Sequence, residues 1–369
     1  MSTSTTKYGK VRDALAEAIQ RGEYTAGQKL PGERVLATSF GISYMTARRA
    51  VYELIQLGIL ERRPWEGVFV ASDSKPRVLT TTTLNVITVG HEPPHVQTLK
   101  RLAARDAQRR NWGARFLRID QPADDAAVRA VLSGDLSLLI IPDDATLRGP
   151  VGEAVQQVNG KAVLVGSRMD NLGVPSVLAD DTQAIGMAVQ HLRASGHRRI
   201  GMLCDYINHP VTSVQIAKWR SCFADECDER ELDRRLIVVD TPRFECPTHS
   251  AYQRMKEVLR HNEAGLTALV CTGDESAVAA MSACRDRGCP VPQKISIVVS
   301  GDSSLAAHCN PPLTCIDVNL ELHIKLAGEM LERALANRLS QADRLRLIEP
   351  HLIERGSVGP APAGTNGQI

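Results

Sequence analysis

Residues 84 to 355 carry a series of short apolar runs, and this series limits the possible fold more than any other feature of the chain. Runs that are apolar throughout suit strands that are covered on both faces. Helical stretches separate them, and such alternation is typical of parallel sheets flanked by helices. We therefore predict an α/β fold for this region from the runs LNVITVG, RFLRI, LSLLIIP, AVLVG, RRIGMLC, RLIVVD, TALVC and ISIVVS.

The length of this region predicts two lobes. It covers about 270 residues, more than one doubly wound sheet needs. The series divides at Ser167 to Leu178, where the run AVLVG is followed by a loop instead of a helix. Ligands of open parallel sheets bind at the carboxyl ends of the strands, so we expect a binding cleft between the lobes.

The N-terminal residues follow a different pattern, in which one helix extends from an N-cap at Ser43 to Gly58. A helical wheel gives this helix an apolar stripe of Ala47, Ala50, Val51 and Leu54. We expect the stripe to be buried. The opposite face carries Met45, Arg48, Arg49, Tyr52 and Gln56.

A short helix at about residues 32–40 precedes this one, and only Gly41 and Ile42 separate the two, which predicts a helix-turn-helix corner. A first helix from Lys7 to Arg21 completes a three-helix unit. Residues 59–61 and 67–70 are β-prone and predict a hairpin wing. Its tip would be basic, since the residues between are Arg62, Arg63, Pro64, Trp65 and Glu66.

This arrangement favours DNA binding, because the N-terminal part of a second helix of this kind reads base edges in the major groove. Arg48 and Arg49 are the first candidates. The alternative is that the two arginines only form the solvated face of the helix. The predicted DNA-binding residues are Arg34, Ser43, Tyr44, Met45, Thr46, Arg48, Arg49, Arg62, Arg63 and Gly67.

Residues 7–71 resemble the DNA-binding domain of the GntR family of bacterial regulators. Its pattern is roughly LPSER, then S-R-x-T-V-R-x-A-L, then a glycine-rich wing that ends in T-F-V. Three positions depart from it: Gly32 replaces a serine, Tyr44 the first arginine of the recognition helix, and Trp65 a wing glycine. The matching residues are Leu30, Pro31, Glu33, Arg34, Ser43, Thr46, Arg48, Ala50, Gly67, Phe69 and Val70.

Charge supports this placement of a DNA-binding unit. Residues 1–77 hold twelve lysines and arginines against eight acidic residues, a net +4, which leaves 32 against 34, a net −2, for the remainder. Neither a membrane span nor a signal peptide is apparent, so we expect a cytoplasmic protein. The nine cysteines include no CxxC pair, which predicts reduced thiols, no metal and no cofactor.

The second region resembles the effector-binding domain of the LacI/GalR family, whose fold is that of periplasmic sugar-binding proteins. The resemblance rests on HL-x3-GHRRI from His191 to Ile200, on VP-x2-ISIVV after Arg287, on PPLT at Pro311 and on a closing HLIERGS. It implies a transcription regulator, in these families most often a repressor, with a sugar-like effector. It also implies a homodimer on a near-palindromic DNA operator.

Two acids follow apolar strands directly and are expected to line the cleft. Asp302 occupies the position of the family's ligand-binding aspartate by resemblance. Asp274 either binds the effector or caps the following helix. Asp180 and Asp181 also open a helix and are expected to lie at the edge of the cleft, with Asp180 as an effector-binding candidate. His91 is expected to line the cleft rather than bind a metal.

The stretch AKWRSCF stands where the family has an effector-binding arginine. Either Lys218 or Arg220 supplies the charge, or Trp219 stacks on a sugar face. Gly273 replaces an asparagine, so a sensor that binds nothing and only dimerises stays open. An enzyme fused to a DNA reader is a further alternative, against which stands the absence of phosphate loops and of an acid/base constellation, with no catalytic residue assigned.

The predicted domain boundaries follow from these patterns. Residues 1–71 form the winged helix-turn-helix domain, and the polar stretch 72–83 is the linker. The two-lobed domain covers residues 84–356, and residues 357–369 form a disordered tail.

Overall fold

The computed structural model divides the chain into two compact units, Met1–Thr81 and Thr82–Ile369. The predicted linker lies mostly outside the described residues, and its last residue, Thr83, begins the first strand of the second unit. The described residues are 7–20, 22–56, 59–63, 66–71, 82–120, 124–158, 160–169, 173–207, 209–242 and 245–362.

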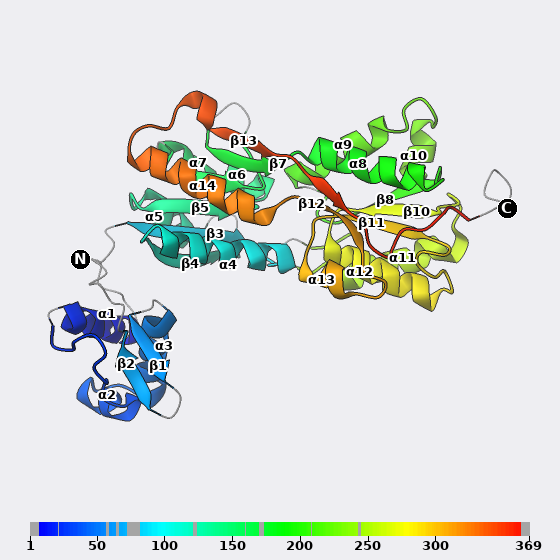
Figure 1. Cartoon of the computed structure of the whole chain (residues 1–369). Helices are drawn as coiled ribbons and strands as arrows, with labels where there is room; N and C mark the ends of the chain where they lie inside the picture. Colours follow the sequence, from blue (N-terminus) through cyan, green and yellow to red (C-terminus); the bar gives the residue numbers. More distant parts are fainter. Residues whose placement is uncertain are drawn as a thin grey trace. The chain divides into compact units, whose positions relative to one another are not determined.

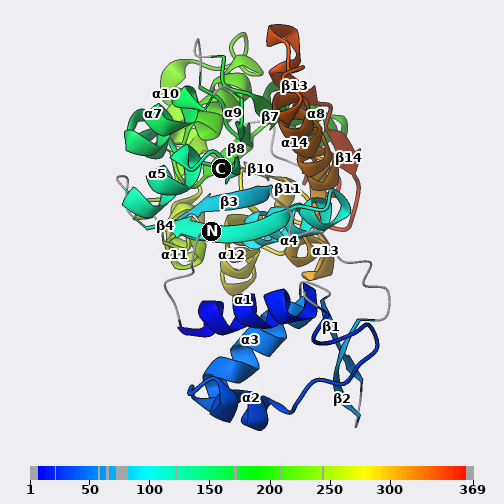
Figure 2. The same ribbon diagram turned by 90° about the vertical axis from the view of Figure 1, so that its left-hand side faces the viewer.

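The first unit is a three-helix domain with a two-stranded wing (Figure 2). Its core contains the predicted stripe, since Ala47, Ala50, Val51 and Leu54 are all buried against the other helices and the wing. The elements are α1 (Lys7–Gln20), α2 (Glu33–Ser39), α3 (Tyr44–Gln56), β1 (Leu60–Arg63) and β2 (Gly67–Val70).

The wing differs from the prediction in one respect. Strand β1 pairs antiparallel with β2 through Arg62 and Arg63, so both arginines belong to the strand and not to the tip. The ladder extends to the pair in which Arg63 lies opposite Gly67. Pro64 and Trp65, at the predicted tip, lie outside the described residues.

The first lobe of the second unit has a six-stranded parallel sheet in the order β13-β7-β6-β5-β3-β4. Helices α4 and α14 cover one face, while α5 and α7 cover the other. The strands are β3 (Thr83–Val89), β4 (Gly113–Ile119), β5 (Leu136–Ile140), β6 (Ala162–Val165), β7 (Ser176–Ala179) and β13 (Leu345–Ile348). The helices are α4 (Pro94–Arg109), α5 (Asp125–Leu132), α6 (Asp144–Arg148), α7 (Pro150–Gln157), α14 (Leu320–Leu335) and the 3-10 turn η1 (Gln341–Asp343).

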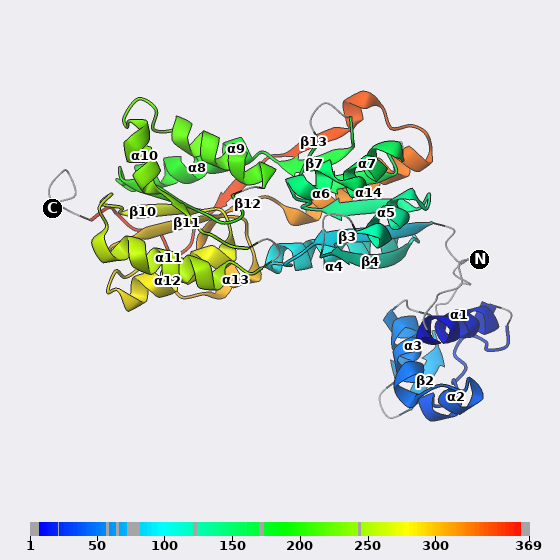
Figure 3. The same cartoon turned by 180° about the vertical axis from the view of Figure 1, so that it is seen from behind.

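The second lobe has a six-stranded sheet in the order β14-β12-β11-β10-β8-β9, in which only β14 is antiparallel. Helices α8 and α9 cover one face, and α11 and α12 the other (Figures 1 and 3). The strands are β8 (Ile200–Cys204), β9 (Leu236–Val238), β10 (Ala268–Cys271), β11 (Ser296–Ser300), β12 (Thr314–Asp317) and β14 (His351–Ile353). The helices are α8 (Asp181–Ala194), α9 (Pro210–Ser221), α10 (Glu229–Arg235), α11 (Thr248–His261), α12 (Asp274–Asp286) and α13 (Ser304–His308).

The chain crosses between the lobes three times, whereas the sequence predicted a single division. The crossings follow β7, β12 and β13, so α14 and β13 return to the first lobe and β14 to the second. The predicted apolar runs did not reveal this, because none of them covers β7, β12 or β13.

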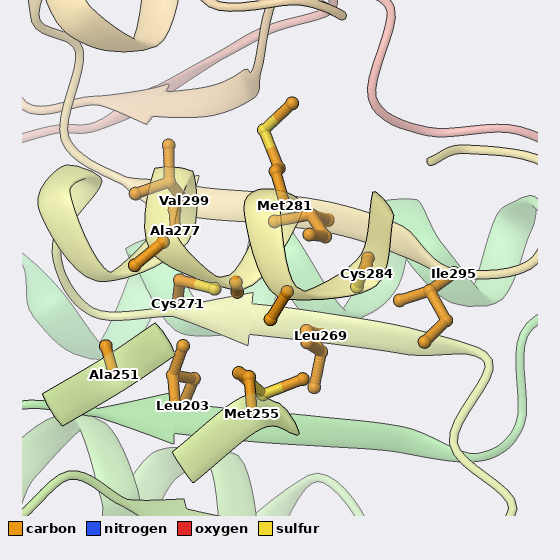
Figure 4. Close-up of a cluster of buried hydrophobic side chains, with 14 of the residues drawn as sticks. Leu203, Ala251, Met255, Leu269, Cys271, Ala277, Met281, Cys284, Ile295 and Val299 are labelled. Atoms are coloured by element: carbon orange, nitrogen blue, oxygen red, sulfur yellow. The ribbon is translucent and has the colours of Figure 1, made fainter. Parts of the chain in front are cut away.

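Each lobe has its own apolar core on either face of its sheet. Figure 4 shows the cluster in which α11 and α12 pack on the second sheet, with Met255, Leu269 and Ile295 fully or almost fully buried. All nine cysteines are free thiols. No helix among the described residues combines the length and the apolar character that crossing a bilayer requires.

The first part of the predicted tail is bound to the second lobe. The buried hydroxyl of Ser357 donates to Ile297 O and accepts the Thr314 N–H at 2.8 Å. Gly359 donates to Ser296 Oγ at 3.0 Å, and its carbonyl accepts from the buried His197. The prediction of disorder from composition is therefore wrong for residues 357–362, while residues 363–369 lie outside the described residues.

Candidate functional sites

Helix α3 presents its polar face to solvent. Ser43 caps the helix as predicted, because its hydroxyl accepts the Thr46 N–H at 3.2 Å. Arg48 and Arg49 are exposed, and the large side chains of Met45 and Tyr52 are 65% and 59% exposed. A helix with a buried stripe and such a face can enter a groove of DNA without unfolding.

Glu33 joins α2, α3 and the wing. Its carboxylate accepts hydrogen bonds from the Tyr44 hydroxyl at 3.1 Å and from Arg62 Nη2 at 2.5 Å. The Arg34 guanidinium lies 6.0 Å from the centre of the Tyr44 ring. Tyr44, which replaces the family's arginine, therefore helps to hold the wing against the recognition helix.

The other wing candidates are also engaged within the wing. Arg63 pairs with Glu61 at 2.6 Å and lies over the Phe69 ring at 4.4 Å. Gly67 has a φ of 120°, and a Cβ there would lie 3.0 Å from the Lys29 side chain. Glycine is thus required at this position by the backbone, and nothing here indicates a direct contact with DNA.

A cleft of about 1040 Å³ lies between the two lobes of the second unit. It opens at the carboxyl ends of the strands, where the sequence predicted it: Val89, Ile140 and Val165 end strands of the first lobe, and Ser300 ends β11 of the second. Its size suits a small organic ligand.

The lining of the cleft is strongly acidic. Arg148 is the one arginine among the described lining residues, which include no lysine. Asp144 pairs with Arg148 and Asp302 with Arg355, but the other carboxylates outnumber these cations and repel anions, so the lining favours neutral or cationic ligands and disfavours phosphates. The carboxyl groups are those of Asp143, Asp144, Asp181, Asp205, Asp240, Asp274, Glu275 and Asp302.

Both predicted strand-end acids line the cleft. Asp274 is 5% exposed and is the first residue of α12 rather than its cap, which is Gly273. Its carboxylate accepts the Glu275 N–H at 3.0 Å. Asp302 pairs with Arg355 Nη2 at 2.8 Å, so one of its oxygens already has a cationic partner.

Asp205 is a cleft residue that the sequence interpretation missed. It is 6% exposed and accepts hydrogen bonds at 2.8 Å from the hydroxyls of Thr272 and Ser276. It follows β8 directly, and Asp274 and Asp302 come shortly after β10 and β11, so a search for acids just after apolar strands predicts all three. A Cβ at Gly273 would lie 2.7 Å from its carboxylate, so a side chain such as the family's asparagine requires Asp205 to move.

The prediction that Asp180 lines the cleft is wrong because, of the two acids that open α8, only Asp181 does so. Asp180 is the N-cap and accepts the Gln183 N–H at 2.9 Å. Asp181 accepts a hydrogen bond from Gln215 at 2.8 Å. Burial, helped by the charge of Asp180, raises the pKa of Asp181 to about 6 although Gln215 opposes the shift.

His91 joins the lobes across the cleft, because its Nε2 lies 2.8 Å from Glu275 Oε2. His95 and His209 also line the cleft, and burial lowers the pKa of each despite nearby carboxylates. Both imidazoles are therefore held neutral near pH 7, so each has one donor and one acceptor nitrogen, and the acceptor Nδ1 of His209 already takes the Val211 N–H at 3.3 Å.

The prediction that Lys218, Trp219 and Arg220 line the cleft is wrong. Trp219 is fully buried in the core under α9 beside Phe223, and Arg220 pairs with Asp233 at 2.6 Å. The Lys218 side chain lies against Gly186 of α8. A helix after a parallel strand begins at the cleft edge and rises about 1.5 Å per residue, so only the first turns of α9, with Thr212 and Gln215, reach the cleft.

The environment of Asp181 makes stability depend on pH. The native state holds this proton up to about pH 6 and the unfolded chain only to about pH 3.8, so stability falls as pH rises through this interval. Asp181→Asn keeps an acceptor for Gln215 and removes the charge. We expect the variant to gain on the order of 2 kcal/mol at pH 8 and almost nothing at about pH 4. Urea unfolding across this range tests it, and a gain that does not vary with pH would contradict it.

Comparisons with known sequences agree with both halves of this description. Residues 7–70 match the family model of bacterial regulatory proteins, gntR family, and residues 189–358 match that of a periplasmic binding protein-like domain. The arabinose metabolism transcriptional repressor of Geobacillus stearothermophilus is 24% identical over 95% of this chain and 97% of its own length. An HTH-type transcriptional regulator in the aml 5' region of Streptomyces limosus is 31% identical, and there the match covers 53% of this chain and 54% of that protein.

Solved structures show the same fold. A complex of the transcriptional regulator CelR with cellobiose aligns with a TM-score of 0.63 at 18% identity and covers 89% of this chain and 100% of that one. A dimeric Lac repressor aligns with a TM-score of 0.63 at 18% identity over 75% of this chain and 99% of its own. The chain joins a gntR-type helix-turn-helix domain to a periplasmic-binding-protein-like domain.

Proposed function

We propose that this regulator is a cytoplasmic, homodimeric repressor that binds operator DNA with α3 and the wing and releases it when an unphosphorylated, sugar-like molecule occupies the cleft. The observation that carries the proposal is a cleft rich in hydrogen-bond acceptors in the same chain as an exposed recognition helix. The proposed role of the cleft is binding without turnover.

The DNA contacts divide into two kinds. Arg48, with Tyr44, Met45, Thr46 and Arg49 around it, is proposed to contact base edges, since these residues lie in the first turns of α3. Arg34, Arg62, Arg63 and the Ser43 hydroxyl are proposed to contact phosphates or to position the elements that do so. Arg62 is proposed both to contact a phosphate and to position the wing, because it is exposed and also bound to Glu33.

The ligand class follows from the chemistry of the cleft. Carboxylates accept hydrogen bonds from pairs of neighbouring hydroxyls, and Asp181, Asp205 and Asp274 offer such acceptors from three strand ends of the cleft. The relative from Geobacillus is named for arabinose metabolism and the CelR structure contains cellobiose, which supports a sugar. The acidic lining supports a neutral sugar over a sugar phosphate.

The two sites are coupled through dimer geometry. A ligand that binds one arrangement of the lobes better than another shifts their equilibrium. In a dimer this shift changes the distance between the two recognition helices, and with it the fit to two half-sites. The solved Lac repressor with this fold is described as dimeric, which supports the same assembly here.

A thermal-shift screen tests the ligand proposal. A neutral sugar at about 100 times its Kd is expected to stabilise the protein by about 2.7 kcal/mol, and its phosphate ester is expected to have no effect. The gain should be lost in Asp274→Asn, which keeps an acceptor for the Glu275 N–H, and retained in the control Asp233→Asn, whose carboxylate is exposed and pairs with Arg220. Stabilisation by sugar phosphates alone would contradict the proposed class.

A further inference from the structure

Three side chains with metal-binding atoms meet at the junction of the lobes. His91 comes from the loop after β3 in the first lobe, whereas Cys246 and Glu275 come from the second, before α11 and in the first turn of α12. One nitrogen, one sulfur and one carboxylate oxygen of these residues all lie within 4.8 Å of one another. His91 and Glu275 are 184 residues apart in sequence, so no local spacing could have predicted the cluster.

The set has the chemistry of a zinc site. Imidazole, thiolate and carboxylate are the three protein ligand types of Zn²⁺, and a site with three of them keeps a fourth position open. Zinc bonds of about 2.0 to 2.3 Å place tetrahedral ligand atoms about 3.3 to 3.7 Å apart, so the cluster needs to shift by only about 1 Å. The fourth position is available to water or to an oxygen of a ligand in the cleft, because His91 and Glu275 line it.

The surroundings favour a cation at this point. The Thr248 hydroxyl lies 3.1 Å from Cys246 Sγ and can donate to the thiolate once the thiol has lost its proton. Asp274 and Asp205 line the same side of the cleft, and their charges attract a divalent ion. His91 now faces Glu275 at 2.8 Å, and a metal would replace the proton between them.

We infer that a divalent transition metal of the zinc type binds to His91, Cys246 and Glu275 and holds the two lobes together. Because its ligands come from both lobes, the ion binds the arrangement seen here better than one in which the lobes have moved apart. Metal binding and ligand binding in the cleft are then linked, and each changes the affinity for the other by the same factor.

Cobalt binding to the full chain tests this inference. Co²⁺ alone is expected to bind in a ratio of one ion to one chain and to give a near-ultraviolet thiolate-to-cobalt charge-transfer band, which Zn²⁺ abolishes by displacement. The band should disappear in Cys246→Ser. His91→Gln and Glu275→Gln are each expected to weaken Co²⁺ binding by more than about tenfold, since loss of even an indirect partner costs about that much.

Two matched controls separate ligation from general effects of mutation. Cys227→Ser changes a partly exposed cysteine outside the cluster, and His351→Gln changes an exposed histidine on β14 that pairs with Asp317. Both variants should bind Co²⁺ as the original protein does. A band retained in Cys246→Ser would overturn the site. Full affinity in His91→Gln would overturn the link between the lobes. The experiment contains no sugar or DNA, so its failure would leave the proposed function untouched.

Discussion

Replacing Trp219 with alanine is expected to lower the free energy of unfolding of the second unit by about 3 to 5 kcal/mol. Trp219 is fully buried between α8, α9 and the second sheet, with its ring centre 5.7 Å from that of Phe223. Its removal leaves a cavity that the packed sheet and helices cannot fill. Urea unfolding of the full chain, followed by circular dichroism, measures the loss.

Two further variants separate the effect of the lost side-chain volume from other effects of mutation. The Trp219 indole N–H has no hydrogen-bond partner within the described structure, so Trp219→Phe forfeits volume but no hydrogen bond and should cost clearly less than alanine. Lys218→Ala, at the neighbouring position outside the cleft, should change stability little. If Trp219→Ala kept full stability and lost only sugar binding, the side chain would be a stacking partner for the ligand and the buried placement would be wrong.

Replacing Arg48 with alanine is expected to weaken specific DNA binding by about 1 to 3 kcal/mol, or about 5- to 150-fold. Arg48 is exposed on α3, in the second turn from the Ser43 cap, where side chains reach base edges. The substitution removes no buried contact, so Tm should stay the same. Fluorescence anisotropy with a DNA fragment selected by the protein from a random library measures the change.

The control for this variant is Arg101→Ala, which removes the same charge from an exposed position on α4 of the other unit. Arg48→Ala, which removes a charge from the exposed face of α3, should relax the preference for one base pair. Arg101→Ala should change neither the DNA affinity nor this preference. Equal affinity of the Arg48 and Arg101 variants would show that the arginines of α3 form only a solvated helix face.

The winged domain could be predicted closely because its determinants are local. The Ser43 cap, the stripe from Ala47 to Leu54 and the short corner before them each follow from residues within a few positions. Only the wing was misjudged. Arg62 and Arg63 lie beyond the β-prone run of residues 59–61 and were predicted at the tip, but their register with Val68 and Gly67 extends the hairpin.

The cleft was less predictable, because its residues meet only after the chain has crossed between the lobes. Asp274 and Asp302 were predicted because they come just after apolar strands, and Asp205 has the same position in the chain. The pairing of His91 with Glu275 depends on the relative placement of two sheets, about which a single sequence carries no signal. The prediction for Trp219 is wrong because this part of α9 lies in the core, away from the edge of the sheet where the cleft opens.

The C-terminal segment shows the limit of composition as a guide. Residues 357–362 are rich in glycine, proline and small side chains, as in a disordered tail. Their order comes from partners far away in sequence, namely Ile297, Thr314 and the buried His197. Long-range hydrogen bonds of this kind leave no periodic trace in the segment itself.

The central claim, that occupation of the cleft controls DNA binding, is tested most directly by measuring DNA affinity with and without the stabilising sugar. At fixed salt, the sugar is expected to lower the affinity for the selected DNA by about 5- to 150-fold, which corresponds to a coupling free energy of about 1 to 3 kcal/mol. Asp274→Asn should bind the DNA equally well and lose the response. A sugar that raises Tm and leaves DNA affinity unchanged would contradict the account.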